Sequence, residues 1–173
     1  MIKLFVCKIC GEPYLGQNVP DDCPFCGAPK EYIKSIDKYS KIWDTELTEV
    51  EEKNMKETLD LEVNATAYYK KVSESNEKYS KYNRLFKQLT RVEKEHAEIA
   101  AKFLGINLPE FTGEDPKESI KEDLKRTKEL EENATKKYKE FLKTSENKFV
   151  KNFFHALIHA EQGHHDFVDG ELS

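Results

Sequence analysis

Cysteine and proline are nearly missing from most of this chain of 173 residues. All four cysteines and four of the six prolines lie within residues 1–36, and no cysteine follows position 26. Because proline breaks helices, its scarcity leaves the rest of the chain free to form long ones. The first 36 residues are too few to fold on a hydrophobic core alone, since chains under about 40 residues usually need a metal or disulfides.

Long apolar runs and an excess of positive charge are also missing. No stretch approaches the roughly 18 apolar residues of a membrane span. The net charge is -5, so the protein lacks the positive electrostatic field that nucleic-acid binding requires. We therefore expect no membrane and no nucleic-acid partner. Cys7 follows the first residue too soon for a signal peptide, so the expected location is cytoplasmic, where clustered cysteines more often bind metal than form disulfides.

The change in composition near residues 35–45 predicts two domains. A small metal domain is expected at 1–36, a linker at 37–45 and a helical domain at 46–173. In the helical domain, Thr48 to Glu51 has the form of a capping box, and Gly105 suits a C-terminal cap. Asp115 and Pro116 resemble an N-cap followed by proline at the first helical position. The expected helices cover about 48–75, 78–104, 115–144 and 146–168.

Loop lengths predict how these four helices are connected. The first two helices and the last two are joined tightly, as antiparallel hairpins. The middle connection, from Gly105 to Asp115, has about 11 residues and spans on the order of 35 Å when extended. A helix of about 24 residues is roughly 36 Å long. The loop can therefore run the length of the bundle, which predicts a mainly α, ferritin-like four-helix bundle with one crossover.

An internal repeat links the two hairpins. Leu61-Glu62-Val63-Asn64-Ala65-Thr66 recurs as Leu130-Glu131-Glu132-Asn133-Ala134-Thr135, at an offset of 69 residues. A Glu-x-x-His motif occurs at Glu93 and recurs at Glu161, at an offset of 68. Each hairpin thus carries one Glu on its first helix and a Glu-x-x-His on its second. The repeat predicts a pseudo-twofold bundle with two equivalent half-sites.

These repeated residues form a plausible set of metal ligands. Glu and His three positions apart lie on one helix face and can bind one ion. Four carboxylates and two imidazoles suit iron or manganese better than copper, and two divalent ions would neutralise the four buried charges. The alternative is that these residues only decorate solvated faces. The candidate catalytic and metal-binding residues are Glu62, Glu93, His96, Glu131, Glu161 and His164, with one Glu from the second helix and one from the fourth bridging the metals.

Other polar residues near these ligands have less certain roles. Tyr69 and Tyr138 lie seven positions after Glu62 and Glu131, so each can orient a ligand carboxylate through a hydrogen bond. Ordinary core tyrosines are the alternative. His165 is less favoured than His164, because the first motif has a spacing of three. We expect three histidines to lie near the ligands without binding metal, or on the surface: His155, His159 and His165.

Two Cys-x-x-Cys-Gly knuckles predict a second metal site, with Cys7, Cys10, Cys23 and Cys26 as ligands. Two thiolates three positions apart can chelate one ion, and paired knuckles predict a tetrahedral four-sulfur site. The sulfur ligands alone do not distinguish one iron from one zinc.

These motifs resemble those of a known family. Cys7 to Tyr14 and Cys23 to Pro29 resemble the short rubredoxin domain of rubrerythrins, and the Glu, Glu-x-x-His, Glu, Glu-x-x-His series resembles the rubrerythrin di-iron bundle. A rubredoxin domain before the bundle resembles the reverse rubrerythrin order. The resemblance implies an NAD(P)H-linked peroxidase or oxygen reductase that receives electrons from an upstream reductase. It also implies a head-to-tail homodimer and a role in oxidative-stress defence.

The chain departs from the family pattern at one position. Typical members carry a further Glu three residues after the ligand of the third helix, where this chain has Ala134. We therefore expect a more symmetric centre. The expected activity is reduction of hydrogen peroxide, or of dioxygen, at two irons, with manganese or zinc as substitutes. The alternatives are a ferroxidase or iron-binding protein, and a non-enzymatic zinc ribbon joined to a helical bundle.

Overall fold

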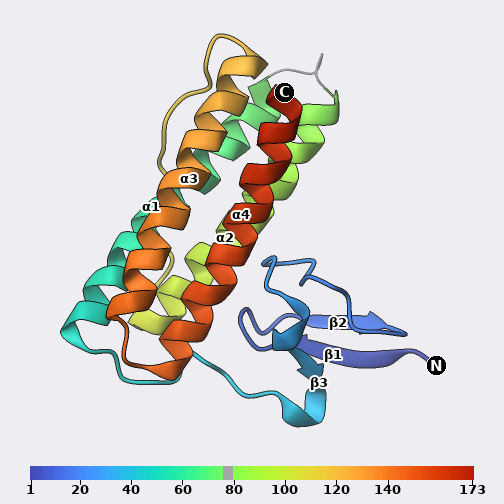
Figure 1. Cartoon of the computed structure of the whole chain (residues 1–173), viewed down its shortest axis with the longest axis vertical. Coiled ribbons are helices and arrows are strands. Elements are labelled where there is room, and N and C mark those ends of the chain that lie inside the picture. The colour runs from blue at the N-terminus through green and yellow to red at the C-terminus, as the bar shows by residue number, and fades with distance from the viewer. Residues whose placement is uncertain (76–79) are drawn as a thin grey trace.

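The computed structural model describes residues 1–75 and 80–173 and has a mainly α architecture (Figure 1). A small N-terminal domain with strands packs beside a bundle of four helices, as predicted. Its three strands form an antiparallel sheet in the order β2-β1-β3. The short elements are β1 (Lys3–Cys7), β2 (Pro13–Gly16), β3 (Ile33–Ser35) and the 3-10 helices η1 (Lys30–Tyr32) and η2 (Ile36–Lys38).

Two glycines close the turns that carry the cysteines. Gly11 has a φ of 84° and Gly27 a φ of 69°, values that side chains with a Cβ rarely adopt. The Gly11 N–H donates to the Cys7 carbonyl at 2.8 Å, and the Gly27 N–H donates to the Cys23 carbonyl at 2.9 Å. Each knuckle is thereby held in a tight turn that directs its two thiols inward.

The bundle consists of two antiparallel hairpins. Helix α1 packs on α2 and α3 packs on α4, and α1 and α3 are also in contact. The loop between α2 and α3 lies along α1, where a Cβ at Gly113 would come within 2.6 Å of the Asn64 carbonyl oxygen. This crossover lets α3 run parallel to α2 (Figure 1), as the loop length predicts. The helices are α1 (Glu49–Ser75), α2 (Ser80–Leu104), α3 (Ile120–Thr144) and α4 (Lys148–Leu172).

The predicted helix ends are partly confirmed. The Glu51 N–H donates to Thr48 Oγ1 and the Thr48 N–H donates to Glu51 Oε2, which is the expected capping box. Gly105 ends α2 with a φ of 64°. The expected beginning of the second helix, near residue 78, lies outside the described residues.

The predicted beginning of α3 at Asp115 is wrong. The helix begins at Ile120, and the Ser119 hydroxyl caps it by accepting from the Glu122 N–H. Asp115 instead pairs with Lys71 of α1, with a distance of 2.8 Å between Asp115 Oδ1 and Lys71 Nζ. The Asp115–Pro116 segment therefore belongs to the crossover loop. Helix α4 also continues four residues beyond its expected end at 168.

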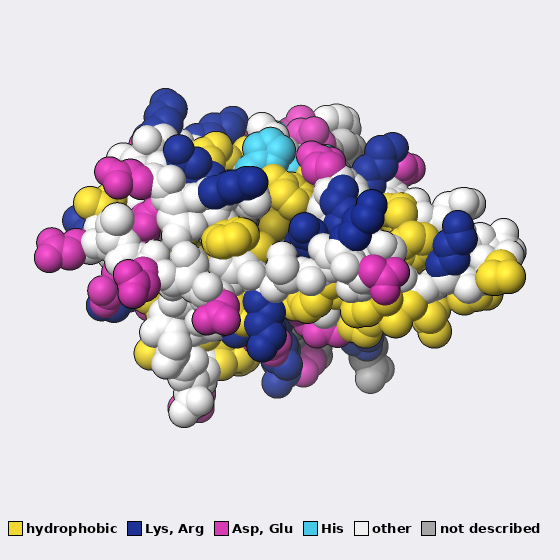
Figure 2. All heavy atoms as spheres, turned by 90° about the horizontal axis from the view of Figure 1, so that it is seen from below, with side chains coloured by type: hydrophobic (Ala, Val, Ile, Leu, Met, Phe, Trp, Pro, Cys, Tyr) yellow, Lys and Arg dark blue, Asp and Glu magenta, His cyan; other side chains and the backbone are white. Residues whose placement is uncertain are grey.

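The surface mixes charge and hydrophobic side chains. Figure 2 shows positive and negative side chains interspersed on the lower face, with hydrophobic side chains gathered where the N-terminal domain lies. Within residues 1–75 and 80–173, no helix combines the length and apolar character needed to cross a membrane. The large exposed hydrophobic side chains of the N-terminal domain are Met1, Ile2, Leu4, Leu15 and Ile36.

Candidate metal centres

The four cysteines converge at one point of the N-terminal domain. Their sulfur atoms lie within 4.8 Å of one another, and all four residues are buried. The Cys7 and Cys26 sulfurs are 3.7 Å apart, and those of Cys10 and Cys23 are 3.8 Å apart. A tetrahedron of sulfurs about 2.3 Å from a central ion has edges of about 3.8 Å, whereas a disulfide needs about 2.05 Å. The cage therefore has the dimensions of a four-thiolate metal site.

Electrostatics also favour a cation in this cage. Contact with the Cys10 sulfur raises the pKa of Cys26 well above its ordinary value, and contact with Cys23 raises the pKa of Cys10 while it lowers that of Cys23. Four thiolates packed this closely would repel one another, so a central cation is what allows all four to ionise. The four-cysteine site fits iron binding.

The six predicted residues of the bundle also come together, in two overlapping groups. Glu62, Glu93, His96 and Glu161 form one group, and Glu93, Glu131, Glu161 and His164 form the other, with ligand atoms within 4.8 Å of one another in each. Glu93 of α2 and Glu161 of α4 belong to both groups, the position of carboxylates shared by two metals. The four Glu and His96 are only 1–3% exposed, and His164 is partly buried.

The nitrogens of both histidines face the carboxylates. His96 Nδ1 is 2.9 Å from Glu93 Oε2 and 3.2 Å from Glu161 Oε1. His164 Nδ1 is 3.1 Å from Glu93 Oε1 and 3.2 Å from Glu161 Oε2. Although these atoms are close, several of them are not aligned for hydrogen bonding. Among the described residues, four buried atoms of the cluster have no hydrogen-bond partner: both carboxylate oxygens of Glu93, Nδ1 of His96 and Oε1 of Glu161.

Unpaired buried atoms of this kind are costly unless a ligand satisfies them. Lone pairs of carboxylates and imidazole that converge without hydrogen bonds match what a metal ion requires. The residues therefore fit a di-metal centre of the carboxylate-bridged type, and the buried cluster fits iron binding.

Burial makes the charge of this cluster expensive in the absence of cations. Burial raises the pKa of Glu131 to about 7, and burial followed by the charge of Glu161 raises the pKa of Glu62 well above its ordinary value. Two divalent ions would cancel the four carboxylate charges. Metal binding and deprotonation of Glu62 and Glu131 are therefore coupled.

The two candidate orienting tyrosines act across the hairpins. Tyr69 of α1 donates to Glu131 of α3 at 2.5 Å, and Tyr138 of α3 donates to Glu62 of α1. Both tyrosines are fully buried. Each tyrosine thus bonds to the glutamate of the other repeat, so each half of the bundle fixes a carboxylate of the other half. This crosswise pairing follows because α1 and α3 run antiparallel, so that Glu62 lies level with Tyr138 and Tyr69 lies level with Glu131.

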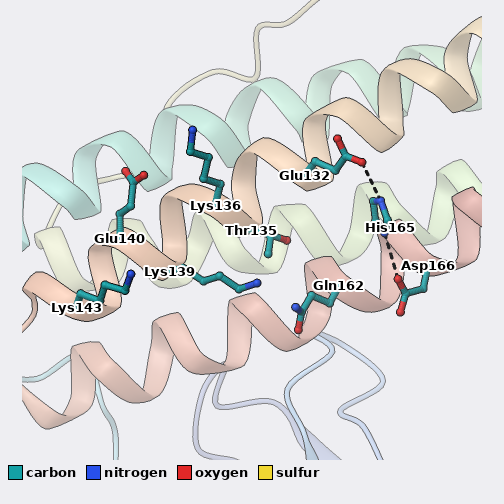
Figure 3. A pocket seen from close by; sticks show the side chains of 9 residues that line it. All are labelled: Glu132, Thr135, Lys136, Lys139, Glu140, Lys143, Gln162, His165 and Asp166. Carbon is teal, nitrogen blue, oxygen red and sulfur yellow. Dashed lines mark hydrogen bonds and ion pairs between the residues drawn. The ribbon is translucent and has the colours of Figure 1, made fainter.

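His165 lies on a different side of α4 from His164. Its Nε2 is 3.1 Å from Glu132 and its Nδ1 is 3.1 Å from Asp166, both exposed carboxylates. Figure 3 shows these three side chains in a groove of about 800 Å³ between α3 and α4, together with Lys139. The groove contains none of the six clustered residues. A spacing of three, rather than four, therefore places the histidine on the inner face.

A hydrogen bond connects the two clusters within one chain. His96 Nε2 lies 2.8 Å from the Cys26 carbonyl oxygen. Because a carbonyl can only accept, Nε2 carries a proton, so in the neutral ring the lone pair of Nδ1 points toward the carboxylates. A backbone carbonyl that holds the second nitrogen of a ligating histidine is a common partner in metal sites. Here that carbonyl belongs to a residue of the four-cysteine cage.

Two histidines with less certain roles in the sequence also join the domains. On α4, His155 Nδ1 is 3.1 Å from the Tyr32 hydroxyl, and His159 Nε2 is 2.7 Å from Asp22 Oδ1. These residues are one turn apart on the helix face that meets the N-terminal domain. Nothing local in the sequence indicates these contacts, because their partners are more than 100 residues away.

Comparison with known proteins agrees with this geometry. A family model for the rubredoxin-like domain of rubrerythrin matches residues 5–34, and a second, described as rubrerythrin, matches residues 53–135. Together the two matches span more than half the chain, in the order predicted from the motifs. The chain belongs to the rubrerythrin family. The second match contains four of the six clustered residues of the bundle, and Glu161 and His164 lie beyond it.

One curated relative is similar to part of this chain. Reverse rubrerythrin-1 from Clostridium acetobutylicum is 30% identical over 114 residues, which are 60% of this chain. The aligned part spans 63% of the length of that relative. No solved structure matches this rubrerythrin.

Proposed function

We propose that this rubrerythrin reduces hydrogen peroxide at the carboxylate–histidine centre, as part of a defence against oxidative stress. In this reaction the O–O bond is broken, and two electrons and two protons convert one peroxide into two molecules of water. Dioxygen is a further candidate oxidant. The electrons would come from an NAD(P)H-dependent reductase and pass through the four-cysteine site, with iron as the metal in both centres.

The single observation that carries this proposal is the contact between Cys26 and His96. A redox metal held by four thiolates would be joined to the bundle centre through one carbonyl group and one imidazole ring. A purely structural metal cage needs no such connection to a buried cluster of carboxylates. The contact therefore supports electron transfer between the two centres.

The residues of the bundle have distinct tasks in this proposal. Glu93 and Glu161 are shared by both groups of ligands, and Glu62 and Glu131 each belong to one. Tyr69 and Tyr138 hold the unshared carboxylates in place by donating to them. Held by these residues, two ferrous ions would together supply the two electrons that cleavage of the O–O bond needs. The buried surroundings keep bulk water away from the centre.

The proposed function also concerns the oligomeric state of the protein. The expected head-to-tail homodimer would place a four-cysteine site beside the bundle of the partner subunit. Within a single chain, the N-terminal domain already contacts its own α2 and α4 through His96, His155 and His159. A single chain would therefore contain a complete electron path. The dimer would then add stability or a second route.

Stopped-flow spectroscopy tests the proposed activity. Fully reduced, iron-loaded protein is mixed with hydrogen peroxide, and the absorbance of both iron centres is followed. We expect oxidation of the bundle centre first and of the four-cysteine iron second. A bundle spectrum that stays unchanged for seconds would refute the proposal. Glu131→Gln should lose bundle iron and this reaction, whereas Glu132→Gln, the adjacent exposed residue, is the matched control.

A ferroxidase is the second candidate, favoured by Ala134 at the position where typical relatives carry an additional Glu. In that case Fe(II) is the substrate and leaves the site after oxidation. Oxidation of many irons per chain would favour this function, whereas a fixed content of about three metals per chain favours the peroxidase. The non-enzymatic alternative requires solvated carboxylates, but the four Glu are only 1–3% exposed.

A further inference from the structure

Two threonines at equivalent positions of the internal repeat have buried hydroxyl groups without partners. On α1, Thr66 lies four positions after the candidate ligand Glu62. On α3, Thr135 lies four positions after Glu131. Both hydroxyl oxygens are buried, and neither has a hydrogen-bond partner in the part of the chain that the structure describes. A buried hydroxyl that lacks a partner is costly, so a small polar molecule beside it is stabilised.

Two other threonines of these helices show the alternative arrangement. On α1, the Thr58 hydroxyl donates to the Asn54 carbonyl at 2.8 Å. On α3, the Thr127 hydroxyl donates to the Asp123 carbonyl at 2.8 Å. Each of these threonines lies one turn before a candidate ligand, and a bond to the carbonyl four positions earlier is common for threonine in a helix. The threonines one turn after the ligands do not make this bond, so their hydroxyls are left to bind a molecule outside the helix.

Thr135 lies at the boundary between the metal-binding face of α3 and the groove between α3 and α4. Because successive residues of a helix are turned by about 100°, Thr135 is turned about 40° from Glu131, and Glu132 about 100°. Glu131 belongs to the buried cluster, whereas Glu132 lines the groove. Thr135 lines the same groove (Figure 3), although its hydroxyl oxygen is itself buried. This hydroxyl therefore lies beneath the groove, on a part of α3 between solvent and the cluster.

The groove brings solvent close to the centre on one side. All nine of its lining residues are polar or charged, so it holds water (Figure 3). One of them, Gln162 of α4, is adjacent in sequence to the cluster residue Glu161. In the first repeat, by contrast, Thr66 is only 3% exposed and belongs to the core of the bundle. The repeat thus gives the centre two equivalent sets of ligands, but a shorter route to solvent on the side of Thr135.

We propose that the Thr135 hydroxyl positions a water molecule that carries protons from the groove to the centre. This inference rests on the proposed peroxide reduction, which consumes two protons along with two electrons, and it identifies the proton route.

The proton transfers balance without any net change in Thr135. The hydroxyl gives its proton to the positioned water and accepts another from water in the groove. The positioned water passes a proton to an oxygen released as the O–O bond breaks, and two such transfers complete two molecules of water. The two electrons come from the reductase of the proposed function, through the four-cysteine site. Thr135 is therefore a positioning residue that acts through the water it holds.

Stopped-flow oxidation of the reduced, iron-loaded protein by hydrogen peroxide tests this role. Thr135→Val keeps the shape of the side chain but removes the hydroxyl. Its second-order rate should fall about tenfold, equivalent to about 1.4 kcal/mol of added barrier. The ratio of its rates in ordinary and heavy water should exceed that of the wild type, because proton transfer then limits the reaction. Thr135→Ser, which keeps a hydroxyl, should restore both values.

Thr127→Val is the matched control, because the Thr127 hydroxyl bonds to a helix carbonyl on the same helix. It should match the wild type in rate and isotope effect, and both valine variants should keep their iron because neither loses a ligand. A wild-type rate in Thr135→Val would overturn the inference. So would an equal fall in Thr66→Val, or loss of iron from Thr135→Val, which would mark a structural role.

A crystal structure of the zinc-loaded protein separates this inference from the proposed function. Density for a water within hydrogen-bond distance of Thr135 Oγ1 is expected in the wild type and in Thr135→Ser, but not in Thr135→Val. A Thr135 hydroxyl that donates to the Glu131 carbonyl instead would overturn the inference, even if peroxide reduction stands. If peroxide does not oxidise the wild type, the proposed function fails, and the density beside Thr135 alone decides whether its hydroxyl holds a water.

Discussion

Gly27 lies where the four-cysteine cage meets the bundle, and a single methyl group there should disturb the electron path. A Cβ at Gly27 would come within 2.9 Å of the Ala160 Cβ on α4. Gly27 also has a φ of 69°, which disfavours a side chain. The Cys26 carbonyl that contacts His96 is the adjacent group in the chain. We therefore predict that Gly27→Ala pushes this knuckle away from α4 and lengthens the contact to His96.

The expected cost has two separable parts. The left-handed backbone costs an alanine about 1–2 kcal/mol, and overpacking against Ala160 costs about 1–3 kcal/mol. Gly11→Ala is the matched control, because Gly11 has a φ of 84° in the other knuckle. Its added Cβ would meet only the far ends of Trp43 and Tyr39, which can move aside. Gly11→Ala should therefore lose about 1–2 kcal/mol, and Gly27→Ala about 2–5 kcal/mol.

Thermal unfolding and stopped-flow kinetics together measure these effects. Gly27→Ala should slow transfer of electrons from the reduced four-cysteine iron to the oxidised bundle centre, whereas Gly11→Ala should not. Ala160→Gly combined with Gly27→Ala removes the clash. The double variant should recover transfer, although glycine within α4 costs about 1 kcal/mol of stability. Equal transfer rates in Gly27→Ala and Gly11→Ala would refute the proposed path.

Three further predictions concern stability and the ligands. Backbone N–H groups of Thr48, Asn147 and Glu146 outweigh burial and lower the pKa of Glu51, so Glu51→Gln should cost about 1–3 kcal/mol at pH 7 in chemical denaturation. Because its pKa is lowered, the ionised Glu51 side chain stabilises the folded protein above about pH 4.5. The stability difference between the wild type and Glu51→Gln should therefore vanish as the pH falls through the pKa of Glu51 in the folded protein. Tyr138→Phe should weaken retention of bundle iron against a chelator but not that of cysteine-bound iron, and equal losses from both sites would contradict its assigned role. Metal-free protein should lose stability as the pH rises from 4.5 to about 7, because burial raises the pKa of Glu131 to about 7 in the folded state. In this range the folded protein keeps a proton that the unfolded chain releases. A free energy of unfolding that does not change with pH would contradict this.

Much of the fold could be predicted because its signals are local. The Thr48–Glu51 capping box and Gly105 fix helix ends through contacts within a few residues. The beginning of α3 was predicted at the wrong one of two local N-cap patterns. Ser119 and Glu122, four residues farther on than the predicted start, have the capping-box form, and the Glu122 N–H donates to the Ser119 hydroxyl. Asp115 contacts Lys71 of α1 instead, and that contact depends on where the crossover loop lies.

The sequence by itself determined which side chains could bind metal. Spacings of three within the Cys-x-x-Cys and Glu-x-x-His motifs, together with the repeat, were enough to name both sets of candidate ligands, whose side chains the structure brings together. Only the tertiary structure decided which carboxylates are shared, that the tyrosines bond across hairpins, and that Cys26 contacts His96. The physical reason is distance along the chain. A motif encodes contacts within one or two turns, whereas these depend on the packing of helices and domains whose residues are many tens of positions apart.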